Sequence, residues 1–202
     1  QAYALDRLTI PEGMDLLRKQ GVQAKDSELQ SAFFYCDGHA FALTLCASLI
    51  RHYHVSLPTL LNDPAYVRLW HGNIARNLLD SIFQQLESSQ QTLLFIFSVV
   101  REPLSLNNLY DLVSAETVIP HKQLQLAIEV LLSQHLLQAT GEERYQVHTL
   151  IASYAREHLA EESREAGEQA LRELHRQVAQ YYLQRSRLKH STVEYQQRED
   201  MY

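Results

Sequence analysis

The sequence has 202 residues, of which 46% are hydrophobic and 21% charged, and its formal net charge is −6. These values are ordinary for a globular protein and allow one large domain or two small ones. The negative charge predicts a surface with no general attraction to phosphate backbones. The longest apolar run, Leu93 to Val100, is too short to cross a bilayer. We therefore expect a protein that binds neither nucleic acid nor membranes.

Glycine, proline and capping residues divide the first part of the chain into a series of predicted helices. These helices cover residues 9–20, 26–35, 39–52, 56–62 and 65–86. Thr9 and Glu12 have the spacing of a capping box, with Pro11 in the first turn. The third helix is apolar on nearly all sides, which is typical of the buried centre of a bundle. We assign residues 1–86 to a small helical bundle.

Residues 87–160 have the order of elements of a winged helix. Helices are predicted over residues 90–100, 103–113 and 120–135, and a further helix over 150–159. Two short runs, 136–139 and 144–148, are joined by a turn that contains Gly141 and predict a β-hairpin. No other segment combines alternating hydrophobicity with turn residues, so we expect no further strands and a fold that is mainly α.

Residues 161–202 are predicted to begin a helical repeat array with one long helix over 163–190. Apolar residues recur there at alternating spacings of three and four, and Arg185 occupies one position of this stripe. The stripe consists of Leu171, Leu174, Val178, Tyr181 and Leu188. The tail from Ser191 is polar, with a hint of a further partly formed helix.

Four stretches, in the same order along the chain, resemble the region that follows the nucleotide-binding domain in STAND-type (NB-ARC-like) NTPases. Residues 8–17 are similar to the opening helix of that family's helical bundle. Residues 36–43 resemble its Gly-Leu-Pro-Leu motif, and residues 145–151 are similar to the Met-His-Asp motif that closes its winged helix. Residues 174–183 look like the lead-in to tetratricopeptide-type repeats.

The resemblance implies a regulatory and coupling module of a nucleotide-dependent signalling switch. Such a module relays the ADP or ATP state to sensor repeats through protein–protein contacts. By resemblance, Gly38, His39, Ala40 and His148 contact the nucleotide, and His148 reaches the β-phosphate of ADP. Ala40 stands where the family has a proline that packs on the adenine, and Thr149 stands where it has an aspartate.

The sequence contains no G-x-x-x-x-G-K-[ST] motif, which is the loop that cradles nucleotide phosphates. We therefore expect no enzyme activity, no catalytic residue and no cofactor in this chain itself. The sequence begins at Gln1 without a methionine, so we expect it to be part of a longer NTPase that binds ADP or ATP with magnesium. Its partners would be an upstream nucleotide-binding domain and downstream repeats, with homo-oligomerisation as a further option.

The cysteines and histidines show no metal-binding spacing. The two cysteines, Cys36 and Cys46, do not form a C-x-x-C motif, and the ten histidines include no H-x-x-x-H pair near a carboxylate. We expect both thiols to be free, which is typical of a reducing, cytoplasmic compartment, and to lie in the core. No metal site is predicted.

Two alternatives to the coupling function stay open. A winged helix suggests a DNA-binding transcriptional regulator, but residues 89–160 carry four Lys and Arg residues against seven Asp and Glu residues. A helix that enters a DNA groove normally meets several phosphates with Lys and Arg. The other alternative is a scaffold without nucleotide dependence, which the departures at Ala40 and Thr149 keep in consideration.

Overall fold

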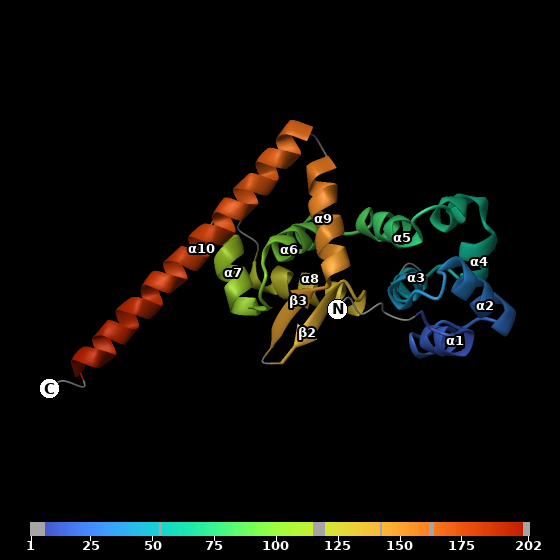
Figure 1. Cartoon of the computed structure of the whole chain (residues 1–202), viewed down its shortest axis with the longest axis horizontal. Helices are drawn as coiled ribbons and strands as arrows, with labels where there is room; N and C mark the ends of the chain where they lie inside the picture. The colour runs from blue at the N-terminus through green and yellow to red at the C-terminus, as the bar shows by residue number, and fades with distance from the viewer. Residues whose placement is uncertain (1–6, 53, 115–119, 142, 162–163, 200–202) are drawn as a thin grey trace. The chain divides into compact units, whose positions relative to one another are not determined.

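The computed structural model of the chain describes residues 7–52, 54–114, 120–141, 143–161 and 164–199, without the side chains of 114, 164–167 and 188–199. The described chain is mainly helical with one small antiparallel sheet, as predicted (Figure 1). Contacts divide it into two units, residues 1–87 with 129–137, and residues 88–128 with 138–202. The predicted division into three domains stays a prediction.

The first unit contains a bundle of short helices, and the first four predicted helices are confirmed. Helix α3 contacts both α1 and α5, and the buried part of α3 includes residues on nearly every side, from Ala42 to Leu49. This burial explains why its sequence is apolar all round. The elements are α1 (Ile10–Lys19), α2 (Asp26–Tyr35), α3 (Ala40–His52), α4 (Leu57–Asn62), η1 (Pro64–Trp70) and α5 (Ile74–Phe83).

Local hydrogen bonds set the bounds of α1. The backbone N–H of Thr9 donates to Glu12 Oε2 over 2.8 Å, and the Thr9 hydroxyl donates to the same oxygen over 2.7 Å. At the other end Gly21 has a φ of +85°, and Val22 N–H donates to Leu17 O over 3.0 Å. This is the arrangement in which a left-handed glycine closes a helix, and it needs no contact from outside the helix.

The prediction of one continuous helix over residues 65–86 is wrong. Its first part is the 3₁₀ helix η1, and α5 begins only at Ile74. Between them Gly72 has a φ of +70°, and Asn73 caps α5 by accepting from Arg76 N–H over 3.1 Å. The Asn77 side chain donates to the carbonyl oxygens of Arg68 and His71 over 2.9 and 2.6 Å, which fixes this break.

The remaining elements follow the predicted order, with one additional strand. Helix α8 and strand β2 each contribute residues to both units. The elements are α6 (Ser88–Val99), β1 (Leu104–Ser105), α7 (Leu106–Ser114), α8 (His121–Ser133), β2 (Leu137–Thr140), β3 (Arg144–Val147), α9 (Thr149–Glu161) and α10 (Arg164–Glu199).

The sheet has the strand order β1-β3-β2, so the predicted hairpin β2–β3 is confirmed and β1 was not predicted. Strand β1 is antiparallel to β3 and places Leu104 opposite Tyr145. Two residues are too few to show alternation, which is why the sequence pattern did not reveal them. The helix expected from Pro103 begins instead at Leu106.

The end of α8 and the turn after it pack within the first unit. Arg51 and His52 of α3 both donate to Ser133 O, over 3.0 Å in each case. Ser48, which is also on α3, donates to Gln134 O over 3.1 Å. The last carbonyl groups of a helix have no partner within the helix, and these three side chains supply their donors. The positive charge of Arg51 also complements the dipole of α8.

Helix α10 runs from Arg164 to Glu199, so it is longer than the predicted 163–190. It contacts α6, α7 and α9, and Figure 1 shows it passing α7. Within its stripe Val178 is buried, and Leu171, Leu174 and Tyr181 are half-buried, while the Leu188 side chain lies outside the described residues. Among the helices described, none is long and apolar enough to span a membrane.

Candidate functional site

The predicted nucleotide-contacting residues Gly38, His39 and Ala40 lie at the junction of α2 and α3. Asp37 and Gly38 both have left-handed backbone angles, φ +52° and +66°, and the N–H of Gly38 donates to Phe33 O over 3.1 Å. The two left-handed residues and this hydrogen bond end α2 and turn the chain into α3.

Gly38 is buried, whereas His39 and Ala40 are exposed. A Cβ atom added at Gly38 would lie 3.0 Å from both Leu8 O and Phe33 Cζ. The glycine is therefore required by close packing and by its positive φ. Of the three predicted contact residues in this loop, His39 and Ala40 present side chains that a ligand can reach.

His148 lies between β3 and the first residue of α9, where it is half-buried. Its Nδ1 accepts a hydrogen bond from Leu150 N–H over 3.2 Å, and its carbonyl accepts from Ala152 N–H over 2.9 Å. His148 is thus the N-cap of α9. Because Nδ1 accepts, the proton of the neutral ring is assigned to Nε2, which makes Nε2–H the donor of this side chain.

A basic pocket of about 530 Å³ adjoins the position of His148 in the second unit. Val147 and Thr149, its two chain neighbours, line the pocket, although His148 itself does not. Three basic side chains also line it, and no Asp or Glu of the described residues does; they are Arg101, Arg156 and His175. The pocket therefore has the charge to accept an anionic group.

Arg156 has a structural role as well. Its guanidinium donates to Ser98 O near the end of α6, and to Ser153 Oγ over 3.2 Å. These bonds hold the side chain at the wall of the basic pocket. The sequence analysis missed Arg101, Arg156 and His175, because three separate segments contribute them and none has a motif around it.

The two predicted halves of the nucleotide contact belong to different units. Gly38, His39 and Ala40 are in the first unit, and His148 is in the second.

The cysteines are core residues, as expected. Cys36 and Cys46 are both buried and both free. Burial raises the pKa of Cys46 to about 12, and burial followed by the neighbouring Cys46 raises the pKa of Cys36 still further. A thiol nucleophile needs a lowered pKa, so neither is suited to that chemistry. No group of three or more His, Cys, Asp or Glu residues in the described part of the chain is placed to hold a metal ion.

The exposed face of α8, the helix that would read DNA, is poor in positive charge. Lys122 is its single Lys or Arg residue, and Leu126 is 52% exposed. Glu129 is exposed on the same helix. An exposed leucine and a glutamate suit a protein contact better than a phosphate contact.

No protein-family model matches this sequence, and a comparison with curated proteins finds no match. Among solved structures, the chain is similar to a signal transduction ATPase with numerous domains (STAND) protein with a tetratricopeptide repeat sensor from Pyrococcus horikoshii. The TM-score is 0.52 at 20% sequence identity, and the match covers 76% of this chain. It covers 20% of the archaeal protein, so this chain corresponds to about a fifth of that protein's length. This likeness shows a shared fold.

Proposed function

We propose that this chain is the regulatory and coupling module of a STAND-type, NB-ARC-like NTPase. In this proposal it relays the ADP or ATP state of an upstream nucleotide-binding domain to downstream sensor repeats through protein–protein contacts. The observation that carries the proposal is the shared fold with part of a STAND protein that has a tetratricopeptide repeat sensor.

The order of elements supports a winged helix within this module. Helices α6, α7 and α8 are followed by the hairpin β2–β3, with β1 paired on β3. The long helix α10 then supplies the first helix of the repeat array. Side chains of α3 donate to the carbonyl oxygens of Ser133, the last residue of α8, and of Gln134, which follows it. These bonds support the proposal that α8 makes contacts within the protein rather than with DNA.

A sensing role for His148 is supported by its position and its chemistry. As the N-cap of α9 it has a fixed place, and its Nε2–H is a donor suited to a phosphate oxygen. The basic pocket beside it favours the same kind of anion. A switch needs contacts that differ between two states, and a bond from His148 to ADP would exist in only one of them.

The proposal assigns nucleotide binding, magnesium and hydrolysis to the upstream domain. One charge-assisted hydrogen bond contributes about 1.5–3 kcal/mol, whereas micromolar binding requires about 8 kcal/mol. The 202-residue chain alone should therefore show no ADP or ATP binding by calorimetry at micromolar concentrations, and no hydrolysis. Tight ADP binding by the isolated chain would contradict this division of labour.

The sensor role is tested in a longer protein that contains this chain. His148→Ala should weaken ADP binding and raise basal signalling, but it also removes the cap of α9. His148→Asn keeps an N-cap acceptor and removes the imidazole, so it should weaken ADP binding to a similar degree. His71→Ala, at an exposed histidine of the first unit, is the control and should have no effect. If only His148→Ala weakens ADP binding, the role of His148 is structural.

A further inference from the structure

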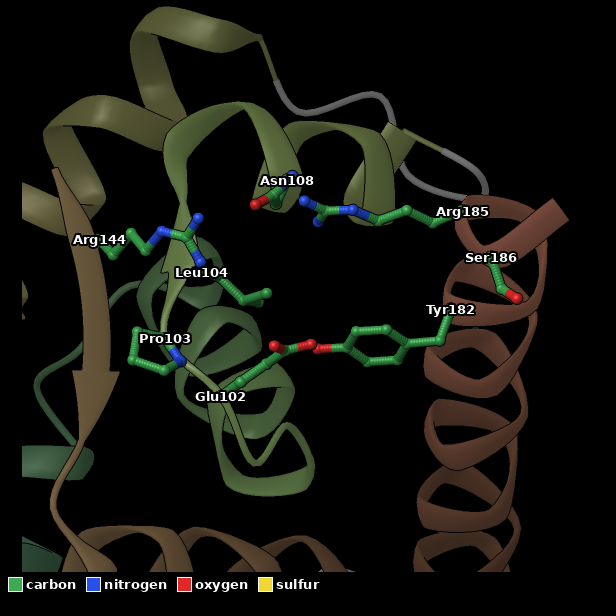
Figure 2. Close-up of a pocket in the computed structure, with 8 residues that line it drawn as sticks. All are labelled: Glu102, Pro103, Leu104, Asn108, Arg144, Tyr182, Arg185 and Ser186. Atoms are coloured by element: carbon green, nitrogen blue, oxygen red, sulfur yellow. The ribbon is translucent and has the colours of Figure 1, made fainter. Parts of the chain in front are cut away.

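A second cavity, of about 310 Å³, lies within the second unit between the sheet, α7 and α10 (Figure 2). Its volume is at the lower end of the range for small-molecule sites. Six of the side chains that line it are polar or charged, namely Glu102, Asn108, Arg144, Tyr182, Arg185 and Ser186. No predicted site residue is among them.

Two arginines face each other across this cavity. Figure 2 shows Arg144 extending from β3 and Arg185 from α10, with both guanidinium groups directed into the space beneath α7. Both side chains are half-buried. Arg185 donates to the Tyr181 hydroxyl over 2.8 Å and lies 6.0 Å from the centre of that ring. Tyr181 therefore orients Arg185 before any ligand arrives, which reduces the entropy lost on binding.

Asn108 adds a neutral donor between the two arginines. Its side-chain oxygen accepts from Ser105 N–H over 3.4 Å at the start of α7. The side chain lines the cavity, where its NH₂ group can donate a hydrogen bond to a ligand. Guanidinium and amide NH₂ groups are donors only, which selects a ligand that accepts hydrogen bonds.

The one carboxylate of the lining is turned toward a tyrosine. Figure 2 shows the Glu102 carboxylate directed at the Tyr182 hydroxyl, whose oxygen is buried. Burial, followed by the neighbouring Glu102, raises the pKa of Tyr182, so the phenol is protonated at neutral pH. Two guanidinium groups against one carboxylate leave the lining with a net positive charge.

We infer that this cavity binds a small anion, carried on a carboxylate or phosphate group, between Arg144 and Arg185. Charge-assisted hydrogen bonds from guanidinium groups are the strong interactions for both kinds of anion. The bound anion would bridge β3 and α10, and it would tie the start of the repeat array to the sheet. This inference concerns a cavity separate from His148 and does not depend on the proposed nucleotide sensing.

The test is a titration of the 202-residue chain with inorganic phosphate and, separately, with succinate. Binding is followed by the NMR signals of the arginine side-chain N–H groups. We expect saturable shifts of the Arg144 and Arg185 signals with at least one probe, and the stronger probe identifies the anionic group. Hydrogen exchange of the α10 backbone near Arg185 should slow when that probe is bound. Absence of a saturable shift with both probes would overturn the inference.

Matched variants distinguish anion binding in the cavity from a general attraction of anions to positive charge on the surface. Arg185→Gln should weaken binding about tenfold or more, since a hydrogen bond to a charged group is lost. Arg144→Gln should act in the same way from the opposite wall. Arg187→Gln makes the same charge change at an exposed site on α10 and should leave the affinity unchanged. Equal losses in Arg185→Gln and Arg187→Gln would refute the site. Arg185 and Arg187 lie on α10, where Arg and Gln have similar helix propensities, and Arg144 lies on strand β3. Circular dichroism of each variant checks that it is folded.

Discussion

His135 Nε2 donates to Gln20 Oε1 over 2.8 Å and thereby joins the turn after α8 to the end of α1. The two residues lie in the same unit although 115 positions separate them in the sequence. His135 has a φ of +60°, and Leu136 N–H donates to Leu131 O over 2.9 Å. The histidine is therefore both the left-handed residue that closes α8 and a contact between distant segments.

This environment predicts a pH dependence of stability. Burial, followed by the charges of Arg51 and His52, lowers the pKa of His135 below its ordinary value. The unfolded chain then binds a proton at a higher pH than the folded chain does. The contribution of neutral His135 to the free energy of unfolding is fully present above the pKa of the unfolded chain, about 6.5. It is lost as the pH falls through the lowered pKa of the folded chain. Urea unfolding at pH 7.5 and pH 5 measures the loss.

His135→Asn is the matched variant, because asparagine tolerates the left-handed backbone and does not titrate. It should reduce the difference in free energy of unfolding between pH 7.5 and pH 5. His54→Asn, at an exposed histidine that also has a positive φ of +53°, is the control and should keep the full difference. An unchanged pH dependence in His135→Asn would assign it to other groups.

Two glycines with positive φ give a paired test of the α2–α3 junction. In Gly21→Ala the new Cβ would have no atom within 4 Å. The variant should lose only the free energy that a left-handed backbone costs an alanine, about 1–2 kcal/mol. Gly38→Ala has a similar φ, but its Cβ would lie 3.0 Å from Leu8 O. We expect it to destabilise the chain by about 1–3 kcal/mol more than Gly21→Ala. Chemical denaturation compares the two, and equal losses would show that the junction relaxes freely.

The stripe of α10 is tested by replacing Leu174 and Val178 with serine. Val178 is 7% exposed, and Leu174 lines an apolar groove together with Phe95 and Leu159. The double variant should lose about 2–5 kcal/mol of stability, since buried apolar groups are removed and hydroxyl groups are introduced. Leu183→Ser, at a residue 59% exposed on the same helix, should change stability by less than about 0.5 kcal/mol.

Thermal unfolding and sedimentation of these variants check the prediction. We expect part of the stripe to pack on a neighbouring chain, so the double variant should also lower the sedimenting mass. An unchanged melting temperature and mass would show that α10 is a solvated spacer.

We expect no measurable binding of duplex DNA at about 150 mM salt, because few basic groups on α8 can displace counterions. Lys122 is the single Lys or Arg residue of that helix, and Leu126 occupies its exposed face. A mobility-shift assay measures this directly. Submicromolar binding that Lys122→Gln abolishes would favour the DNA-binding alternative.

The sequence by itself was sufficient to predict most helices, the hairpin and the mainly α class. The signals are local: the Thr9–Glu12 capping box, the left-handed Gly21 and the turn at Gly141 involve residues within a few positions of one another. Such hydrogen bonds form in the same way in any surroundings, which is why the pattern was enough. The buried α3 was predictable for a similar reason, since an all-round apolar helix has to be covered.

Only the tertiary structure decided the features that depend on distant partners. The break before α5 is fixed by the Asn77 side chain, and β1 exists because β3 pairs with it. The sequence contained one hint of the second cavity, since Arg185 interrupts an apolar stripe, but its counterpart Arg144 comes from another element. Where a side chain meets residues far away in the chain, spacing carries no information about the contact. The direction of the side chain and the packing of the elements determine it.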